Sequence, residues 1–189
     1  MNATQRGKKD LLLMLLKESV NKFYEEQEDL FTRTGMEQTC VGHIYFYMQT
    51  LLKNDDRFVD FKALHLDIEY GKNGDFPKWI DSKKKRPDII LHRRANLSMN
   101  YKGNDKNTMV LEFKTRFATD ENIKKDEKKL CGFTYPNQNN EYPYKYFLGV
   151  LIQLEKENPQ YTFFQNGAKI PEINLLEWEL WKKGTSCKQ

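Results

Sequence analysis

The stretch of residues 146–154 is almost continuously apolar, interrupted only by Gly149 and Gln153. A run of this length without polar alternation is typical of a β-strand that is covered on both faces. Such a strand needs further elements on each side of its sheet, and we expect the rest of the chain to supply them.

Helical spacing of apolar residues predicts two helices in the first third of the chain. The first covers residues 8–31. The second starts near Thr34, because Thr34-Gly35-Met36-Glu37 has the form of a capping box, and it ends before Asn54. Both helices have an apolar stripe that can pack against a sheet.

Three strands are predicted over residues 64–70, 88–92 and 109–115, and the polar residues 95–108 form the turn between the last two. The first of these strands alternates apolar with polar residues and is expected to be half-buried. A charged helix follows over residues 121–131.

We expect this charged helix to have Asp120 as its N-cap and to end at Gly132. After the apolar strand come a further strand at residues 161–165, a turn at Asn166-Gly167, and residues 175–181, which fit a strand or a helix. The order predicts an α/β fold whose first three strands form a meander.

The composition excludes several classes of protein. With 189 residues, of which 39% are hydrophobic, the chain is expected to form a single domain over residues 1–189. The longest apolar run, residues 11–16, is far shorter than the roughly 20 residues that span a bilayer. Three scattered cysteines without a Cys/His cluster indicate neither a zinc site nor a disulfide framework. We therefore expect a cytoplasmic protein without a membrane segment.

Positive charge is concentrated in residues 72–94, where eight basic residues stand against three acidic ones. Such a segment can attract phosphates, or it can be a solvated loop. Lysines on the charged helix offer the same two interpretations. The candidate nucleic-acid-binding residues are Lys83, Lys84, Lys85, Arg86, Lys125 and Lys129.

Asp88 starts the second predicted strand, and Glu112 and Lys114 lie near the end of the third. Because strand side chains alternate, Glu112 and Lys114 project from one face, while Leu111 and Phe113 enter the other. If the two strands pair, Asp88 comes alongside Glu112. Two carboxylates beside a lysine suit Mg²⁺, which can acidify a bound water and neutralise phosphoryl charge. An ordinary surface strand pair is the alternative.

Arg86-Pro87-Asp88-Ile89-Ile90-Leu91, followed after a 23-residue interval by Glu112-Phe113-Lys114, resembles the PD-(D/E)XK nuclease superfamily. The resemblance covers about residues 34–154. It implies a restriction-endonuclease-like αβββαβ core with a mixed central sheet flanked by helices. It also implies metal-dependent phosphodiester hydrolysis, usually of DNA, with Asp88 and Glu112 as metal ligands and Lys114 as the catalytic lysine.

Many members of this superfamily supply another acid from the helix before the sheet, and Glu37 is the matching residue. Glu37 begins the apolar stripe of its helix, so its carboxylate starts on the face that packs inward. It either joins the metal site or closes the capping box with Thr34.

The leading hypothesis is a Mg²⁺-dependent nuclease, with Mn²⁺ as a substitute, that acts on DNA; the residues do not distinguish DNA from RNA. Paired double-strand cuts would require two active sites, and hence a homodimer. The first alternative is a catalytically inactive protein of the same fold that binds nucleic acid or protein. The second is an accessory protein that binds a partner through the aromatic residues of 133–147.

Overall fold

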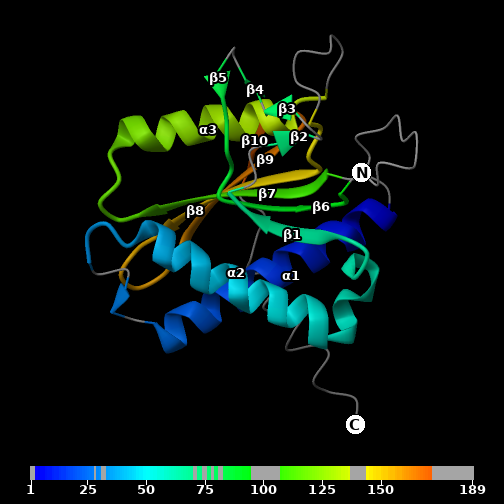
Figure 1. The fold of residues 1–189 in the computed structure, drawn as a ribbon, viewed down its shortest axis with the longest axis horizontal. Helices are drawn as coiled ribbons and strands as arrows, with labels where there is room; N and C mark the ends of the chain where they lie inside the picture. The colour runs from blue at the N-terminus through cyan, green and yellow to red at the C-terminus, as the bar shows by residue number, and fades with distance from the viewer. Residues whose placement is uncertain are drawn as a thin grey trace.

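The protein is described from a computed structural model, which has an α/β architecture with a six-stranded mixed sheet between helices (Figure 1). The residues that the structure describes are 3–27, 29–30, 33–69, 72–73, 76–77, 79–80, 83–94, 107–136 and 144–171.

The central sheet contains six strands, and among its neighbouring pairs only β7 (Asn107–Thr115) and β8 (Leu148–Leu154) run parallel to one another. A parallel pair needs a long crossover connection, which helix α3 (Asp120–Thr134) provides. The three strands predicted first correspond to β1, β6 and β7, which are antiparallel neighbours, so the predicted meander is confirmed. In spatial order the strands are β1 (His65–Ile68), β6 (Ile89–His92), β7 (Asn107–Thr115), β8 (Leu148–Leu154), β9 (Gln160–Gln165) and β10 (Ala168–Ile170).

Helices cover the two faces of the sheet in separate layers. Helices α1 (Ala3–Glu26) and α2 (Glu37–Asn54) lie below the sheet in Figure 1, and α3 lies above it. A short 3₁₀ helix, η2 (Asp56–Phe61), follows α2. Between β1 and β6 the chain forms two small hairpins, which pair β2 (Lys72–Asn73) with β3 (Phe76–Pro77) and β4 (Trp79–Ile80) with β5 (Lys83–Lys84).

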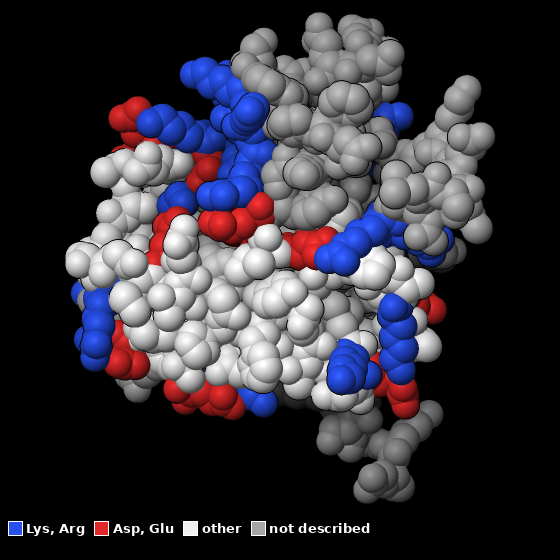
Figure 2. All heavy atoms as spheres, viewed as in Figure 1, with Lys and Arg blue, Asp and Glu red and all other residues white. Residues whose placement is uncertain are grey.

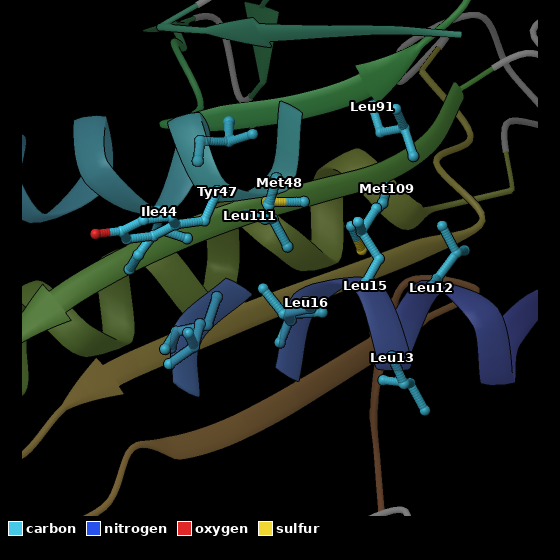
Figure 3. Close-up of a cluster of buried hydrophobic side chains, with 14 of the residues drawn as sticks. Leu12, Leu13, Leu15, Leu16, Ile44, Tyr47, Met48, Leu91, Met109 and Leu111 are labelled. Atoms are coloured by element: carbon cyan, nitrogen blue, oxygen red, sulfur yellow. The ribbon is translucent and has the colours of Figure 1, made fainter. Parts of the chain in front are cut away.

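Two hydrophobic cores result, one on each side of the sheet. Figure 3 shows the larger core, where Leu15 and Leu16 of α1 and Met48 of α2 approach Met109 and Leu111 of β7. The smaller core lies under α3 and is formed by residues of β6, β7, β8 and α3, including Ile90, Val110, Leu151, Leu130 and Phe133.

Strand β8 contributes to both cores: Val150 and Ile152 pack toward α1 and α2, and Leu151 packs toward α3. Burial on both faces confirms the prediction for this strand. The aromatic residues Tyr144 and Tyr146 are also buried in the smaller core, so they stabilise the fold and do not offer a surface to a partner.

The predicted start of the second helix is wrong. Helix α2 begins at Glu37, its N-cap is Met36, and no side chain caps it. Thr34 therefore forms no capping box, because Glu37 is the first helical residue and its carboxylate contacts a lysine of the sheet instead. Helix α1 also differs, since it ends at Glu26 and not at residue 31.

The predicted limits of the charged helix are wrong at both ends. The N-cap of α3 is Thr119, whose hydroxyl accepts a hydrogen bond from the Asn122 N–H, and the helix continues past Gly132 to Thr134. A Cβ at position 132 would lie 2.7 Å from Cγ2 of Ile80. The glycine therefore permits close packing of α3 on β4 and does not terminate the helix.

At the two edges of the sheet, one prediction from the sequence is wrong and one is confirmed. In β1 both Leu66 and Asp67 are buried while Ile68 is 41% exposed, so the predicted alternation fails there. The predicted turn at Asn166-Gly167 is confirmed, with φ angles of 53° and 77°, and it joins β9 to β10, a strand that the sequence did not predict.

Residues 95–106 of the turn predicted over 95–108 lie outside the described part of the chain, whereas Asn107 and Thr108 belong to β7 and not to a turn. Residues 175–181 also lie outside the described part. No helix in the described part of the chain is both long and apolar enough to cross a membrane.

Candidate active site

The register of the sheet brings Asp88 and Glu112 together. Ile89 of β6 pairs with Leu111 of β7, and the next position along each strand sets Asp88 opposite Glu112. Leu111 and Phe113 point into the larger core, so Glu112 and Lys114 point to the other face, toward α3. This juxtaposition, predicted from strand pairing, is confirmed.

Asp88 is held by the backbone of the neighbouring strand. Its Oδ2 accepts a hydrogen bond of 2.8 Å from the Phe113 N–H, and its backbone carbonyl accepts one of 2.8 Å from the Glu69 N–H. Desolvation raises the pKa of Asp88, although the Phe113 hydrogen bond and two nearby lysines oppose the shift. The carboxylate is therefore fixed in position beside Glu112.

Glu112 is the most deeply buried acid of the group, with 1% of its surface exposed. Its Oε2 accepts a hydrogen bond of 2.7 Å from Lys129 Nζ. Its Oε1 lies 2.7 Å from the same ammonium, yet it makes no hydrogen bond within the described structure. Burial raises the pKa of Glu112 well above its ordinary value, against the attraction of Lys129. Both carboxylate oxygens of Glu112 thus lie in contact with the Lys129 ammonium.

Lys129 is a component of this cluster that the sequence did not assign to it. Its ammonium also donates to the Arg86 carbonyl at 2.8 Å, and its side chain is only 11% exposed. Lys125, its expected companion in phosphate binding, is solvent-exposed and pairs with Glu121 at 2.8 Å. Because Lys129 is turned into the cluster and Lys125 into solvent, the two lysines do not form an exposed pair.

Lys114 lies between two acids from different helices. Its Nζ donates to Glu37 Oε1 at 2.9 Å and to the Phe113 carbonyl at 2.8 Å, and it lies 3.0 Å from Asp126 Oδ2. Burial alone would lower the pKa of Lys114, but the bonds to Glu37 and Asp126 outweigh it and raise that pKa. Glu37 therefore contacts the site lysine, and its alternative role in a capping box is wrong.

Asp126 is the second site residue that sequence reasoning missed. It lies four residues before Leu130, and Lys129 lies four residues before Phe133; both of these apolar residues are buried. Residues four apart share a helix face, so this spacing was the signal that Asp126 and Lys129 face the sheet. This signal was weak because seven of the nine residues at positions 121–129 are charged, so charged residues lie on every side of the helix.

Basic side chains border the acidic cluster. Lys83, Lys84 and Arg86 are exposed and Lys85 is half-buried. Arg86 lies 3.4 Å from Glu69 in an ion pair at the surface. Figure 2 shows lysine and arginine side chains gathered above acidic ones, over β5 and α3. Some residues of the predicted basic segment 72–94, including Lys78, lie outside the described part of the chain.

The donors at this site fit a divalent cation held by few protein ligands. Among the described residues, no three His, Cys, Asp or Glu side chains lie close enough to form a protein-only metal cage. Mg²⁺, however, is often bound by one or two carboxylates, with water or substrate oxygens as its other ligands. Asp88 is half-buried beside the buried Glu112, and their carboxylate oxygens are the type of ligand that Mg²⁺ prefers, although Lys129 contacts those of Glu112.

The chain matches no protein-family model, and no curated protein and no solved structure is significantly similar to it.

Proposed function

We propose that the protein is a metal-dependent nuclease that hydrolyses phosphodiester bonds, with DNA as the expected substrate. The observation that carries this proposal is the placement of Asp88 directly beside Glu112, with Lys114 on the same sheet face. A restriction-endonuclease-like αβββαβ core is part of the proposal. The order α2, β1, β6, β7, α3, β8 supports it.

Asp88 and Glu112 are the residues that would hold Mg²⁺, or Mn²⁺ in its place. When bound, such an ion acidifies a water molecule and neutralises charge on the phosphoryl group. The chain's own part is to hold the two carboxylates in place, through the Phe113 N–H for Asp88 and Lys129 for Glu112.

Lys114 serves as a fixed positive charge in this proposal. Because its bonds to Glu37 and Asp126 raise its pKa, it remains protonated at neutral pH and is a poor proton acceptor. Its role is therefore to stabilise negative charge that develops on the phosphate. Glu37 and Asp126 are positioning residues, since they hold the ammonium where it faces the carboxylates.

The exposed basic residues beside the site favour a polyanionic substrate. Arg86 lies two residues before Asp88, and Lys83 and Lys84 precede it in β5. Contacts between such side chains and phosphates are independent of sequence and weaken as salt concentration rises. They would bring a nucleic-acid backbone to the carboxylates without selecting a base sequence.

Cleavage assays test the proposal directly. The purified protein is incubated with single-stranded DNA, double-stranded DNA and RNA, each with Mg²⁺, Mn²⁺ or EDTA. We expect metal-dependent cleavage of DNA, a loss of at least 100-fold in Lys114→Ala, and no change in Lys53→Ala, which removes an exposed lysine from the far end of α2. Absence of cleavage by the folded protein, or full activity of Lys114→Ala, would refute the nuclease hypothesis.

A catalytically inactive binding protein is the second candidate, and one contact favours it. Lys129 already provides an ammonium partner for the deepest acid, Glu112, so the cluster does not depend on a metal for charge compensation. DNA binding that is equal in Mg²⁺ and EDTA, without cleavage in either, would support this candidate.

A further inference from the structure

The outer surface of helix α2 is almost free of charge. None of the fifteen residues 38–52 is lysine, arginine, aspartate or glutamate, although these four types make up 31% of the chain. Figure 2 shows a broad surface over α2, below the candidate site, with hardly any acidic or basic side chain. A helix side that faces only water normally carries charged residues, so this one is better suited to a partner. We call it the α2 face, and its exposed or half-buried residues are Thr39, His43, Tyr45, Phe46, Gln49 and Thr50.

A protruding side chain and a hollow lie next to each other on the α2 face. Phe46 is 61% exposed, the most of any large hydrophobic side chain that the structure describes. Beside it is a hollow of about 600 Å³ between α2 and the end of α1, whose lining includes His43 and Tyr47. Glu26 at its edge is already paired, since it accepts a hydrogen bond of 2.8 Å from the Tyr47 hydroxyl and lies 3.6 Å from Lys22 Nζ. The hollow can therefore receive an apolar side chain without burying an unpaired charge.

The lack of charge indicates which partner fits the α2 face. Nucleic acid is bound chiefly through lysine and arginine, and the α2 face has neither. When two identical chains meet about a twofold axis, the same patch contacts itself, so a charge near the axis meets a charge of its own sign. A different protein can match such a charge with the opposite sign, whereas a second copy cannot. An uncharged patch with both a protruding Phe46 and a hollow is therefore complementary to itself.

The α2 face also has the dimensions of a stable contact. An ordinary interface buries about 800 Å² per chain, which corresponds to a patch about 28 Å on a side. Helix α2 has 18 residues and is about 27 Å long. Strand β1 flanks it on one side, where the Tyr45 hydroxyl donates to the Leu66 carbonyl at 3.2 Å, and α1 flanks it on the other. Ile68 of β1, which is 41% exposed, adds apolar surface to this patch.

We propose that the protein forms a homodimer in which the α2 faces of two chains pack antiparallel about a twofold axis, so that Phe46 of each chain enters the hollow of the other. This inference goes beyond the proposed function, because the α2 face lies on the side of the sheet opposite α3. Charged side chains such as Lys22 and Glu26 then lie at the rim of the contact, and uncharged ones form its centre, as in other protein interfaces. Each dimer carries two copies of the candidate site.

Sedimentation velocity across a 100-fold range of protein concentration measures the association without any activity assay. We expect the average mass of the wild type to rise from the 22.6 kDa of one chain toward twice that value. Phe46→Glu should weaken dimerisation at least 100-fold, because each dimer would then bury two carboxylates in an apolar contact. Phe46→Leu keeps an apolar side chain and should keep the dimer, with its affinity reduced less than tenfold.

Phe117→Glu is the matched control. It makes the same change at another exposed phenylalanine, which is 44% exposed and lies in the turn between β7 and α3. This variant should dimerise as the wild type does. Because the proposed contact is uncharged, a rise in NaCl concentration should not dissociate the wild-type dimer. Circular dichroism confirms that each variant is folded.

Three results would overturn the inference. A wild type that stays monomeric at every concentration would leave the α2 face to a different protein. A dimer that Phe46→Glu does not weaken, or that Phe117→Glu weakens equally, would form through another surface. A dimer that salt dissociates would depend on charged residues, which the α2 face lacks. None of these results bears on the nuclease proposal, which the cleavage assay with Lys114→Ala tests separately.

Discussion

Replacing Lys129 with methionine removes the ammonium that lies 2.7 Å from each carboxylate oxygen of Glu112. Methionine keeps much of the apolar length of lysine, so the change acts chiefly on charge. Glu112 is 1% exposed, and a lone carboxylate cannot remain ionised there without a large penalty. We therefore expect Glu112 to take up a proton in the folded Lys129→Met variant.

The size of the effect follows from this protonation. A carboxyl group that is neutral in the folded state, with its ordinary pKa of 4.5 in the unfolded state, loses about 1.4 kcal/mol of stability for each pH unit above that value. The cost is therefore about 3 kcal/mol at pH 7 and below about 1 kcal/mol at pH 5. Because burial raises the pKa of Glu112 even beside Lys129, part of this cost exists in the wild type. The free energy of unfolding of Lys129→Met should therefore be lower than that of the wild type by at most about 3 kcal/mol at pH 7.

Thermal unfolding in EDTA at pH 5 and pH 7 measures this difference. For a chain of 189 residues, 1 kcal/mol corresponds to about 2–4 °C in Tm. Lys129→Met should therefore lower Tm by up to about 12 °C at pH 7 and by a few degrees at pH 5. The double variant Glu112→Gln/Lys129→Met removes both charges and should recover most of the loss. Equal losses at the two pH values would refute the reasoning.

The remaining predictions concern packing and pH dependence. Gly132→Ala should destabilise the protein by about 1–3 kcal/mol, because the new Cβ would lie 2.7 Å from Ile80 Cγ2. Gly42→Ala, also in a helix, should stabilise the protein by about 0.5–1 kcal/mol, because nothing lies within 4 Å of the new Cβ. The midpoints of urea unfolding should therefore fall in Gly132→Ala and rise in Gly42→Ala, and a lower midpoint in Gly42→Ala would contradict this reasoning. Burial raises the pKa of Asp67, but hydrogen bonds that include those from Arg94 outweigh it and lower that pKa. The wild type should therefore have a larger free energy of unfolding than Asp67→Asn above pH 3.8, and this difference should disappear as the pH falls further. Urea unfolding measures it.

Much of the fold could be predicted from local patterns in the sequence. The apolar stripe at positions 41, 44 and 48 is buried in α2, and the apolar run before residue 154 is a strand covered on both faces. These patterns are reliable because burial of an amphipathic helix or a two-faced strand requires the same spacing in any context. Helix ends were less predictable, since Thr34 and Gly132 have local signals that tertiary contacts override.

The candidate site shows the same division. Asp88, Glu112 and Lys114 could be placed on one face because strand alternation is a property of the backbone. Asp126 was missed, and Lys129 was assigned to phosphate binding and not to Glu112, because both belong to a helix with charged residues on every side.

The sequence by itself determined the order of the elements, the two-sided burial of β8 and the shared face of Glu112 and Lys114, since each depends only on the period of a helix or a strand. Only the tertiary structure decided which lysine each acid meets. Lys114 pairs with Glu37, 77 positions away in the chain, and Lys129 pairs with Glu112 at a separation of 17. Such contacts follow from the packing of helices on the sheet, and helix and strand periodicity does not specify them.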